Sequence, residues 1–517
     1  MERNSSILGG ALLLTAANLL LRLISIAFNV FLADQIGAAG LGLLQLISTI
    51  GVFAMLVGTS GVRVAAMYLS AEEFGHRRLS GVREAVSSCL RYGLIISSAA
   101  GVLLFLLADF FSVQLLQDIR AASSLRIMGI LLPFTCLCGI MTGYFTACGR
   151  IKQLVIIEIA ERIVSMTITT LLLLTWAYGD LERSCWAITF GSSIGCMFDF
   201  LFLYFRYRKD ICHVPSSKEP LHMQKRLIRL CVPLALNDYL RAGLNTAEQL
   251  LIPFGLSRYA GSSQQAMADY GTIHGMVFPI LMFPAVILYS LSDLLVPELS
   301  RCRAMRRQRR IVDLTDKCIR MGILFAGGVA GFLFINAHEL GLLIYHSKSA
   351  GQYLRSFAPM VLVLYTDAIV DGVLKGLAEQ ISCVRYNTFT SMLDVLFLFL
   401  LLPRWGIRGY IFTFTITHAV NLFLSMRRVL LVSEHRARPS DFVRPLCAAL
   451  LASFLAFLLP LPNNSLFLCV LLRGGYFLIL LCATVLLTGA FTGKDYRWLR
   501  RVVLRSSQRI DRKQNSS

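Results

Sequence analysis

The sequence predicts an all-α, polytopic membrane protein with about 14 transmembrane helices. Of its 517 residues, 56% are hydrophobic and only 15% are charged, whereas soluble proteins contain about 25% charged residues. The hydrophobic residues fall into stretches of about 20 residues, the length that an α-helix needs to cross a bilayer. No segment between these stretches exceeds about 25 residues, which leaves no room for a soluble catalytic domain.

The predicted spans follow one another along the whole chain. They cover residues 7–33, 40–69, 87–109, 122–148, 153–178, 185–205, 228–256, 267–298, 316–337, 356–379, 384–403, 408–428, 443–461 and 467–490. The first stretch is too long for the core of a signal peptide and has no clear cleavage site at its end. We therefore interpret it as an uncleaved first helix.

Basic residues are concentrated in alternate loops. Roughly 32 Lys and Arg fall on one side of the predicted topology and about 8 on the other, and the densest run is 301–310. The positive-inside rule assigns this side, with both termini, to the cytoplasm. The net charge of +20 is then a topology signal and an attraction to anionic membrane lipids, and we do not expect nucleic-acid binding.

The chain contains an internal repeat. Asn18 and Arg22 form an Asn-x-x-x-Arg pattern in the first span, and Asn237 and Arg241 repeat it in the seventh. Six helices per block make the two blocks parallel, an arrangement in which transporters bind substrate between the halves near the midplane. The predicted parts are an N-terminal six-helix lobe (1–215), a C-terminal six-helix lobe (216–432), two additional helices (433–495) and a basic cytoplasmic tail (496–517).

Polar residues in the first span lie on one helical face, while the opposite face is apolar. They are Thr15, Asn18, Arg22, Ser25 and Asn29, spaced by three or four residues. Such a face is expected to line water or substrate, because charges at membrane depth are costly elsewhere. Arg22 has no carboxylate within one turn, so its guanidinium is suited to bind an anion, especially a phosphate.

The seventh span repeats the pattern with Asp238, Arg241, Asn245 and Glu248. Here the carboxylates lie on either side of Arg241, so the residues form either an ion-paired packing stripe or part of a binding cavity. Both interpretations remain open from the sequence.

The tenth span contains Asp367, Asp371, Lys375 and Glu379 at four-residue steps. These acids and the lysine could pair within the helix. Alternatively, Asp367 or Asp371 could bind a coupling cation, either sodium or a proton, and Asp238 and Glu248 are candidates for the same role.

The sequence contains no signature of a metal site or a nucleotide site. The 14 cysteines include no pair with metal-site spacing, and most lie in apolar segments. The segment 489–495 is one residue short of P-loop spacing and ends in Asp. We therefore predict no metal, no cofactor and no ATPase activity.

Several segments resemble the stage V sporulation protein B group. They are 270–284 with its Tyr-Gly, Gly-Met and Pro, the Leu-Val-Pro at 295–297, the mid-helix Arg22, Gly37, Gly40-Leu-Gly42 and Ser60-Gly61. The group belongs to the multidrug/oligosaccharidyl-lipid/polysaccharide exporter superfamily, which includes lipid II flippases and multidrug and toxic compound extrusion antiporters.

This resemblance implies two six-helix lobes forming a V around a central cavity, with two extra helices as in lipid II flippases. It implies alternating-access movement of an undecaprenyl-pyrophosphate-linked saccharide, a peptidoglycan or polysaccharide precursor, to the outer leaflet of the cell membrane. Lipid II flippases hold the pyrophosphate with cavity arginines, a role that Arg22 and Arg241, and secondarily Arg63, would take here. The first helix of this chain has one arginine where those flippases often have more, so the resemblance does not decide whether lipid II itself is the cargo. The cavity asparagines would be Asn18, Asn29, Asn237 and Asn245.

Two alternatives remain. A cation-coupled drug exporter of the same superfamily would need a cavity dominated by carboxylates and aromatic residues, and Arg22 counts against it. A membrane enzyme acting on lipid-linked glycans would need a large outer loop with catalytic residues. The longest outer segments, 110–121 and 338–355, are short and poor in such groups, so we predict a transporter and not an enzyme.

Overall fold

The structure is a computed structural model that describes residues 3–59, 61–76, 78–211, 220–434, 439–458 and 465–489. At residues 3–18, and at a few other helical positions that include Asn237, only the backbone is described. Every regular element in these ranges is a helix, so the predicted all-α class is confirmed. The predicted tail, 496–517, lies outside the described residues.

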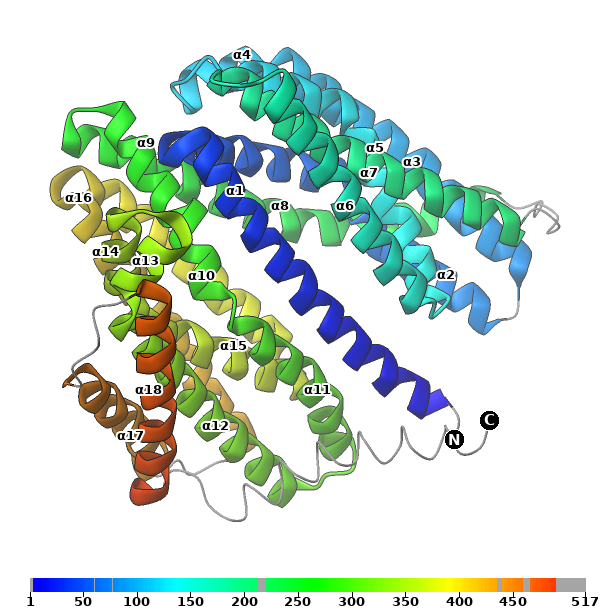
Figure 1. Ribbon diagram of the computed structural model, residues 1–517. Coiled ribbons are helices and arrows are strands. Elements are labelled where there is room, and N and C mark those ends of the chain that lie inside the picture. Colours follow the sequence, from blue (N-terminus) through cyan, green and yellow to red (C-terminus); the bar gives the residue numbers. More distant parts are fainter. Residues whose placement is uncertain are drawn as a thin grey trace. The chain divides into compact units, whose positions relative to one another are not determined.

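Figure 1 shows the helices in chain order from blue to red. They are α1 (Arg3–Thr59), α2 (Val62–Gly75), α3 (Leu79–Leu106), α4 (Ala108–Phe110), η1 (Phe111–Leu115), α5 (Ala121–Ala147), α6 (Ile151–Thr175), α7 (Leu181–Ile211), α8 (Pro220–Ala260), α9 (Ser263–Gly271), η2 (Thr272–Val277), α10 (Phe278–Met282), α11 (Ala285–Ala304), α12 (Gln308–Ile335), α13 (Ala337–Tyr345), α14 (Lys348–Phe357), η3 (Ala358–Met360), α15 (Val361–Gly376), α16 (Gln380–Ser433), α17 (Pro439–Leu458) and α18 (Leu466–Thr488).

Two of these helices are each two helices joined at a glycine. α1 breaks at Gly37 (φ 68°) and α16 breaks at Gly406 (φ 56°). Both breaks fall between two predicted spans, where a positive φ favours glycine because it has no Cβ. Gly61 (φ 72°) then separates α1 from α2 inside the predicted span 40–69, and its neighbour Ser60 lies outside the described residues.

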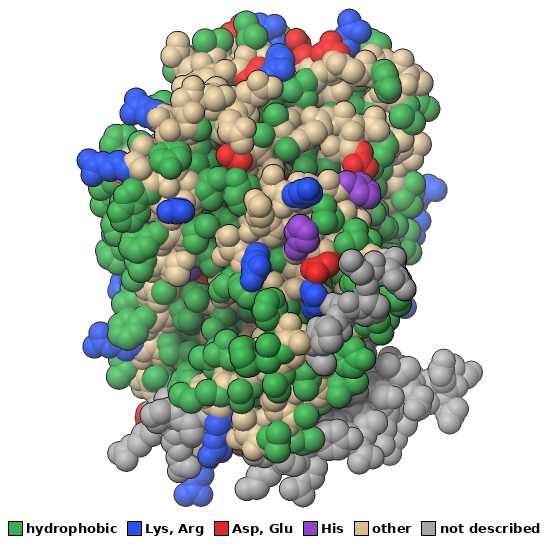
Figure 2. Space-filling model, turned by 60° about the vertical axis from the view of Figure 1, so that its left-hand side comes forward, with side chains coloured by type: hydrophobic (Ala, Val, Ile, Leu, Met, Phe, Trp, Pro, Cys, Tyr) green, Lys and Arg blue, Asp and Glu red, His purple; other side chains and the backbone are tan. Residues whose placement is uncertain are grey.

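The helices have the length and composition of membrane spans. In the described part of the chain, eight helices are long and apolar enough to cross a bilayer, or nine if one bent pair counts as a single span. α16 alone has 54 residues, about 80 Å if straight, which is more than twice the thickness of the hydrocarbon core. Many large apolar side chains are exposed on the outer faces of the helices (Figure 2). The chain is a multi-pass membrane protein, and the count of 14 spans stays a prediction.

The eighth predicted span, 267–298, is bent in the structure. The helices over Ser263–Met282 and Ala285–Ala304 meet at an angle of 54°. Pro284 stands at the break, and the π-helix η2 lies two turns before it. Proline removes a backbone hydrogen bond, and π-helical turns often occur at functional sites, so this helix has two local departures from α geometry.

The chain divides into two compact units. We call residues 31–254 and 263–271 the N-unit, and residues 1–30, 255–262 and 272–517 the C-unit. The first half of α1 thus belongs to the C-unit, and most of α8 belongs to the N-unit. The division predicted from the repeat is a different partition and stays a prediction.

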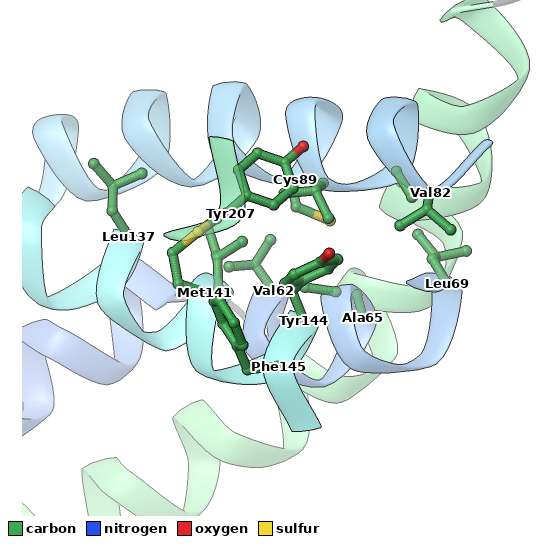
Figure 3. Packing of buried hydrophobic residues seen from close by; sticks show 14 of the residues in the cluster. Val62, Ala65, Leu69, Val82, Cys89, Leu137, Met141, Tyr144, Phe145 and Tyr207 are labelled. Atoms are coloured by element: carbon green, nitrogen blue, oxygen red, sulfur yellow. The ribbon is translucent and has the colours of Figure 1, made fainter. Parts of the chain in front are cut away.

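The core of the N-unit is formed by α2, α3, α5, α7 and the beginnings of α6 and α8 (Figure 3). Tyr144 and Tyr207 meet edge to face with 5.0 Å between ring centroids, an arrangement that adds about 0.5–1.5 kcal/mol beyond area burial. Cys231 of α8 is completely buried in the same cluster. Arg226 of α8 also pairs with Glu72 of α2 at 2.7 Å, so packing and charge both tie this helix to the N-unit.

The C-unit is built on close contact between α11 and α15. A Cβ atom at Gly372 would collide with the Ser292 side chain, so only glycine allows this approach. The last two helices are part of the same unit, because α17 and α18 share an apolar cluster with the end of α12. Arg473 of α18 donates to Glu339 at 2.7 Å and to the Ile335 carbonyl at 2.9 Å, which caps the end of α12.

We expect Gly271→Ala to lower the melting temperature of the purified protein. A methyl group at Gly271 would collide with the Ala38 carbonyl within the N-unit, and overpacking costs about 1–3 kcal/mol. Gly243→Ala is the matched control, because a Cβ atom there meets nothing within 4 Å. Equal melting temperatures for the two variants in detergent would contradict the close approach of α1 and α9.

Candidate functional site

The polar face of α1 carries an arginine without a partner. Arg22 is exposed, and its guanidinium forms no hydrogen bond or ion pair with any residue that the structure describes. Ser25 donates to the Leu21 carbonyl at 2.8 Å, so this hydroxyl is satisfied within the helix. Asn29 is half-buried, whereas the Asn18 side chain lies outside the described residues. Among the side chains of this face that the structure describes, Arg22 is the positive charge that is available for an anion.

The surroundings of Arg22 are acidic as well as aromatic. Its charge acts on the hydroxyl of Tyr289 in α11, and the charges of Asp367 and Asp371 act on the same hydroxyl. All four residues belong to the C-unit. Arg22 and two of the four predicted ion-coupling carboxylates, Asp367 and Asp371, therefore share one unit, whereas Asp238 and Glu248 belong to the other.

The polar face of α8 is not neutralised internally. Arg241 has no ion-pair partner in the described part of the chain, although Asp238 lies one turn before it. Arg241 and Asn245 are exposed, and Asp238 and Glu248 are half-buried. The missing ion pair at Arg241 speaks against the ion-paired stripe, and the binding cavity stays a prediction. The Asn237 side chain lies outside the described residues.

Arg63 occupies the second position of α2, directly after the turn at Gly61. Its backbone is fixed by α5, since a Cβ atom at Gly143 would lie 2.6 Å from the Arg63 carbonyl oxygen. The side chain is exposed. Arg63 and Arg241 belong to the N-unit and Arg22 to the C-unit, and the role of all three in binding diphosphate stays a prediction.

A buried polar cluster surrounds Asp367. One Asp367 oxygen accepts a hydrogen bond from the Asn421 amide at 2.9 Å, and the same amide donates to Asn387 at 2.9 Å. The second Asp367 oxygen and the Asn421 side-chain oxygen are buried without a partner. An unsatisfied buried acceptor costs about 1–3 kcal/mol, and a cation or a proton at this position would remove that cost.

A second carboxylate lies buried on α16. Asp394 is 6% exposed and accepts a hydrogen bond from Thr417 at 2.5 Å. Thr417 belongs to a stripe at four-residue spacing along the second half of α16 that also includes Thr413, Asn421 and Ser425, all buried. This helix therefore presents a polar face to α15 and to the first half of α16.

The two carboxylates of α15, Asp367 and Asp371, have hydrogen-bond partners on α16. Asp371 accepts a hydrogen bond from the Cys383 thiol at 3.5 Å, and Lys375 is exposed with no ion pair in the described residues. Glu379, in the turn after α15, pairs with Arg428 of α16 at 2.9 Å. Hydrogen bonds from Ser382 and from Arg428 lower the pKa of this carboxyl, which keeps it ionised.

His274 lies inside the π-helix and is packed among aromatic rings. Its ring stacks on Phe278 with centroids 4.9 Å apart, and its Nε2 atom lies 3.1 Å from the Tyr410 hydroxyl. These contacts favour a packing role for His274. No group of three or more His, Cys, Asp or Glu within the described ranges could hold a metal ion.

Comparison with known proteins assigns the chain to a family. A family model described as polysaccharide biosynthesis protein matches residues 7–303, which is more than half of the chain. Stage V sporulation protein B of Bacillus subtilis (strain 168) is 22% identical over 410 residues, covering 78% of this chain and 79% of that protein. Sporulation protein YkvU of the same strain is 20% identical over 399 residues, covering 76% of this chain and 87% of that protein.

Solved structures show the same fold. The lipid II flippase MurJ in an inward closed conformation matches with a TM-score of 0.70 and 15% identity, over 92% of this chain and 99% of MurJ. An inward-facing multidrug resistance transporter of the MATE family matches with a TM-score of 0.63 and 12% identity, over 80% of this chain and 95% of the transporter. The resemblance seen in the sequence is therefore confirmed, and the chain belongs to the polysaccharide biosynthesis protein family.

Proposed function

We propose that this protein flips an undecaprenyl-pyrophosphate-linked saccharide from the cytoplasmic to the outer leaflet of a bacterial cell membrane. The observation that carries the proposal is a pair of mid-helix arginines, Arg22 and Arg241, each without a counter-ion among the described residues. The family description and the flippase among the solved relatives support a saccharide attached to a lipid as the cargo.

The chemistry of the arginines suits the diphosphate. A guanidinium at membrane depth is costly unless it meets an anion or water, and its planar fork binds phosphate oxygens in pairs. Asn29 and Asn245 lie two turns and one turn further along the same helices, where amides can hydrogen-bond to sugar hydroxyls. A single arginine contributes a moderate amount of binding energy, so it can select the diphosphate and still release it.

In the proposed cycle the diphosphate and sugars enter a polar cavity while the lipid chain stays in the bilayer. A change between inward- and outward-open states then exposes the cargo to the other leaflet. No covalent bond is made or broken, so the protein acts as a transporter and not as an enzyme. The asymmetry of Lys and Arg between the loops supports an orientation with both termini in the cytoplasm.

The cluster around Asp367 supplies a site for a coupling cation, either sodium or a proton. It offers a carboxylate and two side-chain amide oxygens, the hard ligands that small cations prefer. Its two unpartnered buried oxygens favour occupation over an empty state. Asp371 is a secondary candidate in the same unit, and Asp238 and Glu248 are candidates in the N-unit.

The same cluster favours a second candidate function, cation-coupled export of drugs or toxic compounds. A solved relative with this fold is a multidrug transporter. A drug exporter makes no use of unpaired arginines, however, because most of its cargo is cationic or apolar. For this reason we rank the lipid-linked saccharide first.

We expect Arg22→Ala and Arg241→Ala each to reduce lipid movement about 10- to 100-fold, since a hydrogen bond to a charged group contributes about 1.5–3 kcal/mol. Reconstituted liposomes with a fluorescent undecaprenyl-pyrophosphate saccharide provide the measurement. Arg22→Lys keeps the charge without the paired geometry and should lie in between. Arg404→Ala, an exposed arginine of the C-unit, is the control.

Three outcomes of that assay separate the proposals. Wild-type movement that survives both alanine substitutions would keep the flippase and refute the site. A folded wild type that moves no lipid, but carries a cationic dye down an ion gradient, would replace the flippase with the exporter. A folded wild type that does neither would refute both.

We expect Asp367→Asn to abolish the dependence of transport on the coupling ion. The amide occupies the same space but removes the negative charge that holds the cation. Transport is measured across a range of sodium gradients and pH gradients, with Asp313→Asn, an exposed carboxylate, as control. The coupling site would be refuted by an Asp367→Asn protein that keeps the wild-type ion dependence.

A further inference from the structure

Five unpaired arginines gather in one turn of the C-unit. The turn joins α11 to α12 and carries Arg301, Arg303, Arg306, Arg307 and Arg309, all exposed. We call these five residues the arginine turn. Its one large exposed apolar side chain, that of Met305, is 61% exposed at the centre.

Two nearby arginines of the same unit, in contrast, form ion pairs with glutamates. Arg310 pairs with Glu298 at 2.5 Å, and Arg428 pairs with Glu379 at 2.9 Å. None of the five residues of the arginine turn has an ion pair or a hydrogen bond from its side chain within the described residues. Arg303 acts electrostatically on the Glu379 carboxylate, which Arg428 already holds.

The turn is held in one backbone conformation. Arg306 adopts a left-handed conformation with φ 50°, and the Arg307 amide donates to the Cys302 carbonyl at 2.9 Å. The Gln308 side chain donates to the Ser433 carbonyl at 2.8 Å, which ties the turn to the end of α16. The five positive charges are thus concentrated within nine residues of a turn whose backbone is hydrogen-bonded, and like charges gathered in this way repel one another.

We infer that the arginine turn is a binding surface for the phosphate groups of anionic phospholipids. The turn connects two membrane helices, so it lies at the level of the headgroups of one leaflet. Guanidinium groups bind phosphate oxygens in bidentate fashion, and Met305 places an apolar side chain where the acyl region begins. That the leaflet is the cytoplasmic one rests on the orientation proposed above; the binding itself does not.

Nucleic acid fits the turn less well than lipid. A nucleic-acid surface usually extends over one face of a domain and interleaves aromatic side chains for base stacking. The arginine turn is short, has no aromatic residue between 301 and 310, and is attached to two helices that end at the membrane.

Bound lipid would act on a helix that can bend. α11 follows the 54° break at Pro284, so the arginine turn is the far end of the segment that follows this bend. An anionic lipid that holds the turn would restrict that segment. We therefore expect the rate of transport, as well as lipid binding, to depend on the anionic lipid content of the membrane.

The test measures binding of phosphatidylglycerol to the full chain in detergent, by native mass spectrometry and by the rise in melting temperature. The variant replaces all five residues, Arg301→Gln, Arg303→Gln, Arg306→Gln, Arg307→Gln and Arg309→Gln, and a second variant carries lysine at the same positions. We expect the glutamine variant to lose at least about 10-fold in apparent lipid affinity. The lysine variant should keep part of it, because it retains the charge.

Controls separate the lipid from other anions and from a folding defect. The double variant Arg404→Gln/Arg408→Gln, at the break in α16, removes exposed arginines elsewhere in the C-unit and should bind lipid as the wild type does. Phosphatidylcholine should give no response. The melting temperature of each variant without lipid reports its folding.

The inference is overturned if the glutamine variant is folded and binds phosphatidylglycerol as tightly as the wild type. It is also overturned if the wild type responds to inorganic pyrophosphate or to an oligonucleotide and not to phosphatidylglycerol. The assay requires no lipid movement, so its failure is distinguishable from failure of the proposed flippase activity.

Discussion

The constraint on which the rest of this structure depends is the absence of water in the bilayer core. A backbone in hydrocarbon must satisfy its own hydrogen bonds, which leaves a chain of this composition only helices. Helices can then approach closely only where side chains are small, as at Gly372 against Ser292 and at Gly271 against Ala38. The same constraint drives polar side chains away from lipid, so Asp394 is buried against Thr417, and Asn421 is buried against Asp367. Packing and polarity thus have a common cause.

The departures from regular helix occur where chain direction or polarity has to change. Gly37 and Gly406 divide long helices into two spans each. The π-helix at residues 272–277 and the break at Pro284 lie in one segment, and His274 of that π-helix packs against Phe278 and Tyr410. A segment with two such interruptions bends at lower cost than a continuous helix. The segment is therefore suited to the changes of shape that alternating access requires.

Much of this architecture could be predicted from the sequence, because span length and hydrophobicity are local properties. The helix breaks at Gly37 and Gly406 lie between predicted spans, because the local drop in hydrophobicity marks where one span ends and the next begins. Arg22, Arg241 and Asp367 were identifiable because a charge in an apolar stretch is conspicuous. Asn387 and Asn421 were missed because neutral amides in such a stretch give a weaker signal, and Asp394 was overlooked although it is an isolated acid within a span.

Partners across helices could not be predicted, because they depend on how helices rotate against each other. The four-residue spacing from Asp367 to Glu379 suggested ion pairs within one helix. In the structure Asp371 accepts a hydrogen bond from Cys383 of α16, and Glu379 pairs with Arg428, 49 residues away. The grouping of the first half of α1 with the C-unit was hidden for the same reason.

That grouping has a consequence for coupling. Arg22 and Asp367 act electrostatically on the same hydroxyl, that of Tyr289, so a cation at Asp367 would make the potential near Arg22 more positive. Direct electrostatics therefore makes a bound cation and a bound diphosphate favour each other, and linkage makes this preference mutual. Exchange of an outward-moving lipid for an inward-moving cation requires the opposite effect, in which binding of one ligand weakens binding of the other. Such exchange must arise because each ligand selects a different conformation of the protein. The bent segment before α11 is the element of the C-unit that is best suited to adopt two conformations.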